Sequence, residues 1–237
     1  MECRKCKVEV FAMKRLIIYV FAALVSITIS AQGRYKYCKS YEDFIDDHWE
    51  KLDTVYCKKN RRNQKFWWEG NDYNLTTGNK DLDNILKKEA FIVMQADTAF
   101  LNLHNIKHDK LSICRAFTKA KRFNEHGLIF THPIINKKIL QEMTSAGFML
   151  GTIGRLSVTA DYADKIVCYV ISSGADKKGD IDTRMIDDEM IDEMMDKNII
   201  KDGKLYLEYL SEGKKVKRML APHIIPILEK AGLLKYE

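Results

Sequence analysis

The sequence predicts an α+β fold: a short helix, then a mainly antiparallel β-sheet, then a C-terminal helical segment. Short apolar runs of strand length, separated by turn residues, fill much of the chain between residues 54 and 171. After Gly174 the pattern changes, and apolar residues recur at helical spacing among charged ones. Strands followed by a block of helices are typical of α+β proteins.

The first apolar run is too short for a typical membrane-spanning helix. Lys14 and Arg15 precede residues 16–29, which carry no charge, and the small residues Ser30 and Ala31 follow. This order is typical of a secretory signal peptide. We expect cleavage near Ala31 and export to the periplasm or cell surface, so that only this segment meets the membrane before cleavage. An uncleaved anchor and a buried core helix are the alternatives.

The sequence divides into three expected parts. Residues 1–31 are expected to be an upstream extension plus the signal peptide, and to be removed. We expect Met13 to be the start, with residues 1–12 as the upstream extension, and Met1 is the alternative. We expect residues 32–174 to form the helix and the antiparallel sheet. Residues 175–237 are expected to form a helical segment that packs on the same domain.

Charge gives little support to a nucleic-acid partner. The chain has 39 Lys and Arg against 33 Asp and Glu, a net charge of +6. Residues 1–31 hold five of the basic and two of the acidic residues, so the remainder has 34 against 31, or +3. Nucleic-acid-binding domains are usually more basic. We therefore expect no nucleic-acid partner.

A short helix is expected first in the remaining chain. Ser40, followed three residues later by Asp43, resembles a capping box. Apolar residues at helical spacing come next: Phe44, Ile45, Trp49 and Leu52. "TVYCKK" then predicts a strand.

A β-hairpin is expected in "AFIVMQADTAFLNL". Ala90–Met94 and Ala99–Leu103 are apolar runs of strand length, and Gln95–Thr98 connects them. Four further segments have strand-like lengths: "KLSICRAF", "KRFNEHGLIFTH", "GFMLGTIGRLSVT" and "KIVCYVIS". "HPIINKKILQEM" lies between them and is more typical of a helix.

Three helices are expected after the change of pattern. "TRMIDDEMIDEMMDK" places its apolar residues on one face, with Asp182 or Thr183 as the N-cap. "GKLYLEYLSEG" and "KKVKRMLAPHIIPILEKAGLL" predict two more. Pro222 and Pro226 are expected to break or kink the last helix.

Four cysteines follow the expected cleavage point, and an even number in an exported chain permits disulfides. Cys38 and Cys57 lie on either side of the first expected helix, whereas Cys114 and Cys168 lie in apolar, strand-like runs. We expect the pairs Cys38–Cys57 and Cys114–Cys168. Buried free thiols are the alternative.

The segment "KKNRRNQKFWWEG" places basic residues directly before Phe66, Trp67 and Trp68. Exposed aromatic rings can stack on sugar rings, so these three residues are the candidates for glycan binding. Basic residues beside aromatics can also hold nucleic acid, but export argues against that partner. The alternative is a basic hairpin turn, in which the two tryptophans face opposite sides of a strand and at least one is in the core.

The sequence contains no complete catalytic or metal-binding pattern. "DKKGDIDTRMID" lacks the ligands and the glycine that a calcium loop needs. His104 and His108 have the spacing of two zinc ligands on a helix, but they lie between expected strands and no Glu follows His104. We therefore expect no catalytic residue, no metal and no cofactor.

Several segments, taken in order, resemble a family of exported proteins of unknown function from Gram-negative gut anaerobes. After the leader they are "SYEDFIDDHW", "KKEAFIVMQADTAFLNL", "GFMLGTIG", "YVISS" and "LYLEYLSEG". The resemblance covers nearly the whole chain after residue 31 and brings no catalytic or binding residues with it. We expect a non-enzymatic binding or structural component of the cell envelope, whose partner is a glycan or another envelope protein. A glycan-binding module that uses the tryptophans is the alternative, and a secreted hydrolase is a third reading.

Overall fold

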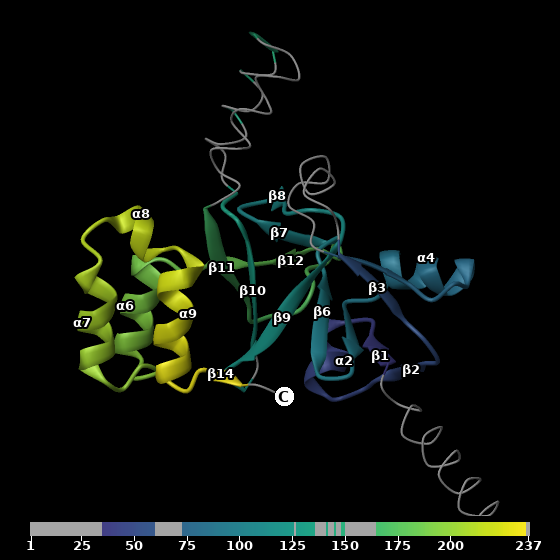
Figure 1. Cartoon of the computed structure of the whole chain (residues 1–237), viewed down its shortest axis with the longest axis horizontal. Coiled ribbons are helices and arrows are strands. Elements are labelled where there is room, and N and C mark those ends of the chain that lie inside the picture. Colours follow the sequence, from purple (N-terminus) through teal and green to yellow (C-terminus); the bar gives the residue numbers. More distant parts are fainter. Residues whose placement is uncertain are drawn as a thin grey trace, which may run out of the picture.

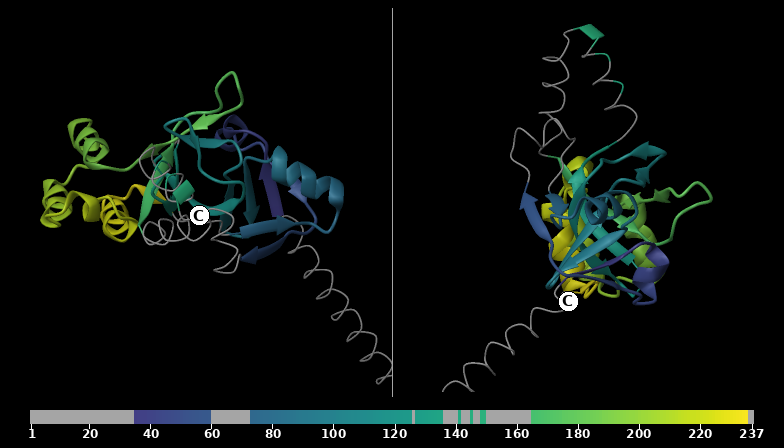
Figure 2. Two further views of the ribbon diagram at one scale, coloured as in Figure 1. Left: turned by 90° about the horizontal axis from the view of Figure 1, so that it is seen from above. Right: turned by 90° about the vertical axis from the view of Figure 1, so that its right-hand side faces the viewer.

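The computed structural model describes residues 35–59, 73–125, 127–135 and 165–235, together with Gln141, Ser145, Phe148 and Met149. The predicted α+β class is confirmed, because a large and mainly antiparallel sheet is joined by helices early and late in the chain (Figure 1). The C-terminal helices lie at one end of the molecule and α4 (Lys80–Lys88) lies at the other (Figures 1 and 2).

Short strands and one short helix open the described chain. In order they are β1 (Tyr35–Cys38), α2 (Tyr41–Ile45), β2 (Glu50–Leu52), β3 (Tyr56–Lys59) and β4 (Tyr73–Thr76). The predicted capping box of α2 is confirmed, because the Ser40 hydroxyl accepts from the Asp43 N–H at 3.0 Å and the Asp43 carboxylate accepts from the Ser40 N–H. The helix is shorter than expected, because Asp47 turns the chain with φ 58° and β2 then pairs with β1.

Helix α4 was not predicted from the sequence. Its N-cap is Asn79, whose side chain accepts from the N–H groups of Asp81 and Leu82. At the other end Asn102 donates to the carbonyls of Leu86, Lys87 and Ala90, at 3.1, 3.1 and 2.8 Å. A side chain 16 residues away in the sequence thus holds the end of this helix.

The predicted hairpin is confirmed, and further strands follow it. The strands are β5 (Ile92–Gln95), β6 (Thr98–Asn102), β7 (Ile106–His108), β8 (Leu111–Ser112), β9 (Phe117–Phe123), β10 (Gly127–Pro133) and β11 (Ile166–Ile171). Of these, β7 and β8 belong to a second, three-stranded sheet. Gln95 pairs with Thr98, so the hairpin turn contains only Ala96 and Asp97. Ala96 has φ 50°, as the first turn residue of a type II′ turn requires.

Strand β9 is a branch point at the centre of the eleven-stranded sheet. One edge of β9 pairs with β4 at Phe117 and with β10 from Ala120 onward. The other edge pairs with β6 up to Ala120 and with the last strand, β14 (Leu234–Lys235), at Arg122 and Phe123. The two ends of one strand therefore belong to different parts of the sheet.

The C-terminal segment begins with two short strands, β12 (Ile181–Asp182) and β13 (Arg184–Met185). The helices that follow are α6 (Asp188–Asp196), α7 (Gly203–Ser211), α8 (Lys215–Arg218) and α9 (Ala221–Lys230). The expected N-cap of the first of these helices was wrong. Residues 184 and 185 pair with β11 instead of joining the helix, and the Asp187 side chain caps it by accepting from the Met190 N–H at 3.1 Å. Pro222 lies in the first turn of α9, whereas Pro226 lies inside that helix.

Three hydrophobic clusters form the core. Because successive side chains of a strand point to opposite faces of the sheet, neighbouring residues of one strand can belong to different clusters. The first lies between α2 and the sheet from β1 to β11 and includes Phe44 and Tyr169. The second joins the C-terminal helices to β9, β10 and β11 through residues such as Cys168. The third packs α4 and β4 against the sheet around Phe100. The second cluster therefore contains residues of both the sheet and the C-terminal helices. The predicted domain boundary near residue 174 stays a prediction.

The structure corrects the disulfide prediction, because none of the four cysteines that it describes forms a disulfide. Cys38 belongs to the first cluster, whereas Cys57 packs against the third. Cys114 belongs to the first cluster, whereas Cys168 points from β11 into the second. Each expected pair is therefore divided between two core clusters, so the thiols do not meet.

No helix within the described ranges combines the length and the apolar character needed to cross a lipid bilayer. The expected signal peptide and Ala31 lie outside these ranges.

Candidate ligand-binding site

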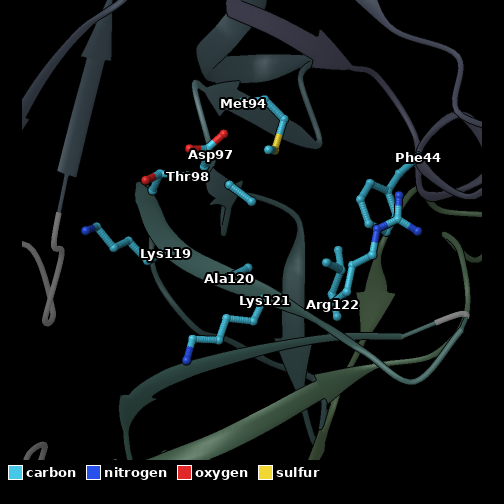
Figure 3. A pocket seen from close by; sticks show the side chains of 10 residues that line it. Phe44, Met94, Asp97, Thr98, Lys119, Ala120, Lys121 and Arg122 are labelled. Carbon is cyan, nitrogen blue, oxygen red and sulfur yellow. The ribbon is translucent and has the colours of Figure 1, made fainter. Parts of the chain in front are cut away.

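The candidate site is a cavity of about 190 Å³, here called the junction pocket, where β6, β9 and β10 meet near α2 (Figure 3). Its lining residues come from four strands, one turn and one helix: Phe44, Met94, Asp97, Thr98, Ala99, Lys119, Ala120, Lys121, Arg122 and Leu128. Liquid water would fill this volume with roughly six molecules, so the pocket is small.

The branch in the sheet explains why a pocket forms at this point. Along one edge of β9, β6 pairs with Ala120 and β14 begins at Arg122. The position between them, Lys121, therefore lies where one partner strand ends and the next begins. Four consecutive residues of β9 line the pocket in consequence, from both faces of the strand.

Three cationic side chains give the junction pocket its charge. The Arg122 guanidinium lies 4.4 Å from the centre of the Phe44 ring, a cation–π contact that holds it over α2. The Lys121 ammonium lies 3.3 Å from Glu229 of α9. The Lys119 ammonium lies 5.7 Å from the ring of Tyr73. With Asp97 in the lining and Glu229 beside Lys121, these three cations face two carboxylates, so a net positive charge remains and the pocket favours an anionic group.

The floor of the pocket is apolar. Met94 and Ala120 are buried, and Leu128 and Phe44 belong to the first core cluster. The hydroxyl-bearing residue Thr98 lies beside Asp97 at the rim (Figure 3). The site therefore combines cations, one carboxylate and an aliphatic surface.

A second aromatic ring extends the site beyond Phe44. The half-buried Trp49 packs edge-on against Phe44 with 6.0 Å between ring centres. The Lys36 ammonium lies 4.2 Å above the Trp49 ring, and Lys36 pairs across β1 and β5 with Met94 of the pocket. A fourth cation and a tryptophan thus lie next to the junction pocket.

A smaller cavity of about 90 Å³ lies beside His104 and Asn102, between α2, α4 and residues 175–181. The Nδ1 atom of His104 is buried without a hydrogen-bond partner among the described residues. Burial, followed by Arg115, Lys87 and Lys88, lowers the pKa of this imidazole. The lowered pKa favours the neutral imidazole, and the cavity has the polarity to hold water.

The two histidines that the sequence analysis tested as metal ligands have separate surroundings. His104 is in a turn, whereas His108 is buried in β7 with Nδ1 3.0 Å from the Thr183 carbonyl oxygen. In the part of the chain that the structure describes, no three His, Cys, Asp or Glu side chains are grouped as a metal site would need.

The residues predicted to bind glycan, Phe66, Trp67 and Trp68, lie outside the described residues. The junction pocket was not predicted from the sequence. The alternation in "FTKAKRF" places Lys119 and Lys121 on one face of a strand, but nothing local indicates that Asp97 or Phe44 lies nearby.

The fold and the pocket together define an α+β protein with a branched antiparallel sheet and a small cationic cavity at the branch. Residues 36–235 match the model of a family of unknown function, DUF6563. The chain therefore belongs to this family, and the predicted membership of a family of unknown function is confirmed. Comparisons with curated proteins and with solved structures found no match.

Proposed function

We propose that the protein is an exported, non-enzymatic binding component of the cell envelope, and that the junction pocket holds an anionic group of its ligand. The observation that carries the binding role is that Lys119, Lys121 and Arg122 all line this pocket, together with buried apolar residues. Export rests on the leader pattern that ends near Ala31.

The chemistry of these side chains supports binding. Lysine and arginine carry positive charge at neutral pH and donate hydrogen bonds to carboxylate, phosphate or sulfate oxygens. The cation–π contact with Phe44 and the ion pair with Glu229 hold two of the three cations in place. A preorganised cationic cavity loses less side-chain entropy when an anion enters. Binding should weaken as salt rises, because the site is open to solvent ions.

The test is an NMR titration of the purified protein with sodium glucuronate, a small carboxylate, at constant ionic strength. We expect saturable shifts at the backbone amides of Ala99 and Ala120. A Lys119→Gln, Lys121→Gln double variant should bind about fivefold more weakly, as expected for the loss of two partly exposed charges.

The matched control is Lys58→Gln, on the exposed part of β3 away from the pocket lining. Its affinity should stay within about twofold of the wild-type value. Wild-type protein without saturable shifts, or a control as weak as the double variant, would contradict the proposed function.

A further inference from the structure

We infer that Asp97 makes the junction pocket selective for hydroxylated carboxylic acids of the size of one sugar ring, such as sugar acids. This inference rests on the proposed function, because it assigns a ligand class to the same pocket. Bare anions such as phosphate use only the cations, whereas a sugar acid also uses the carboxylate and the apolar floor.

Asp97 is held at the rim by the hairpin turn. It follows Ala96, and the flanking residues Gln95 and Thr98 pair directly, so the turn has only two residues. Figure 3 shows Asp97 and Thr98 together, on the side of the pocket away from Lys121. A ligand whose charged group meets the lysine therefore presents its opposite side to Asp97.

The Asp97 carboxylate is available to a ligand. It makes no hydrogen bond or ion pair with another described residue, although three cations line the same cavity. An ionised carboxylate only accepts hydrogen bonds, and two of its lone pairs can receive neighbouring hydroxyl groups. The same negative charge repels a second anion, so Asp97 disfavours ligands that bring charge without donors.

The size and floor of the pocket match the remaining surface of such a ligand. Met94, Ala120 and Leu128 present aliphatic groups against which the C–H face of a sugar ring can pack. A volume of about 190 Å³ accepts a single ring.

The experiment compares four probes on the full-length protein at one pH and ionic strength, by NMR titration. Glucuronate carries a carboxylate and hydroxyl groups on one ring. Glucose lacks the carboxylate, cyclohexanecarboxylate lacks the hydroxyls, and inorganic phosphate lacks the ring. We expect glucuronate to bind about tenfold more tightly than each of the other three, since a hydrogen bond to a charged group contributes about that factor.

The Asp97→Asn variant tests the role of the carboxylate. It should bind glucuronate about tenfold more weakly and bind phosphate as well as, or better than, the wild type. The matched control is Asp109→Asn, at the corresponding two-residue turn between β7 and β8, which should leave all four affinities unchanged.

The outcomes separate the two proposals. If no anion binds the wild type, the proposed function fails. If glucuronate, cyclohexanecarboxylate and phosphate bind alike, or if Asp97→Asn leaves glucuronate binding intact, the pocket binds anions but the inference about Asp97 is wrong. If Asp97→Asn does not fold, which thermal unfolding followed by circular dichroism would reveal, the four affinities of the wild type test the inference by themselves.

Discussion

Replacing Asp188 with Asn should destabilise the C-terminal helices in a pH-dependent way. The Asp188 carboxylate, in the first turn of α6, accepts from Arg218 Nε at 3.0 Å and from Arg218 Nη2 at 2.9 Å. It also accepts from the hydroxyl of the buried Tyr209 at 2.7 Å. One side chain therefore joins α6, α7 and α8.

The expected loss of stability in Asp188→Asn follows from the pKa of this carboxyl. Hydrogen bonds from Arg218, opposed by burial and aided by Tyr209, lower the pKa of Asp188 from 3.8 to about 2. At about 1.4 kcal/mol per pKa unit, the interactions of Asp188 can contribute at most roughly 2.5 kcal/mol to the free energy of unfolding. The side chain is 23% exposed, so solvent screening reduces the expected loss to about 1–2 kcal/mol.

The sign of the pH dependence is set by this lowered pKa. Because the folded-state pKa lies below the unfolded value, the stabilisation is complete above about pH 4 and is lost as pH falls toward 2. Urea unfolding followed by circular dichroism should show wild type and Asp188→Asn separated by a constant free energy from pH 7 to 5. The gap should narrow between pH 4 and 3.

The control is Asp196→Asn, which makes the same charge change at the last residue of α6. This variant should stay within about 0.5 kcal/mol of the wild type, as most exposed surface substitutions do. Equal stability of wild type and Asp188→Asn at pH 7, or a gap that stays constant down to pH 3, would refute the reasoning.

Three further changes test other parts of the fold. Ala96→Gly should raise the free energy of unfolding by about 0.5–1 kcal/mol, because glycine adopts φ 50° without the cost that alanine carries; a lower stability in urea would contradict this turn geometry. Asn102→Ala should lower it by about 2–3 kcal/mol, since three carbonyls at the end of α4 lose their donor, and an unchanged urea midpoint would exclude that role. Without reductant, thiol titration of the native protein should modify the partly exposed Cys57 before Cys168, whose pKa burial raises to about 12; a disulfide at either position would contradict the structure.

Local sequence patterns predicted the elements whose signals lie within a few residues. Ser40 and Asp43 form their capping box, and "MQADTA" forms the hairpin turn, because these features depend on residues a few positions apart. The patterns failed where distant segments compete for the same residues. Leu52 and Met185 were expected in helices, but they lie in strands because β1 and β11 offer free edges for pairing.

The sequence by itself determined the α+β class, the hairpin and the C-terminal helices, because hydrophobic period and capping act within one element. Only the tertiary structure decided that β9 branches, that the cysteines are divided among core clusters, and that Asp97 shares a pocket with Lys121 and Arg122. These features depend on which strands pair and on which face each residue occupies. A register shift of one residue would move every side chain of a strand to the opposite face of the sheet. That register is set by contacts between segments far apart in the chain.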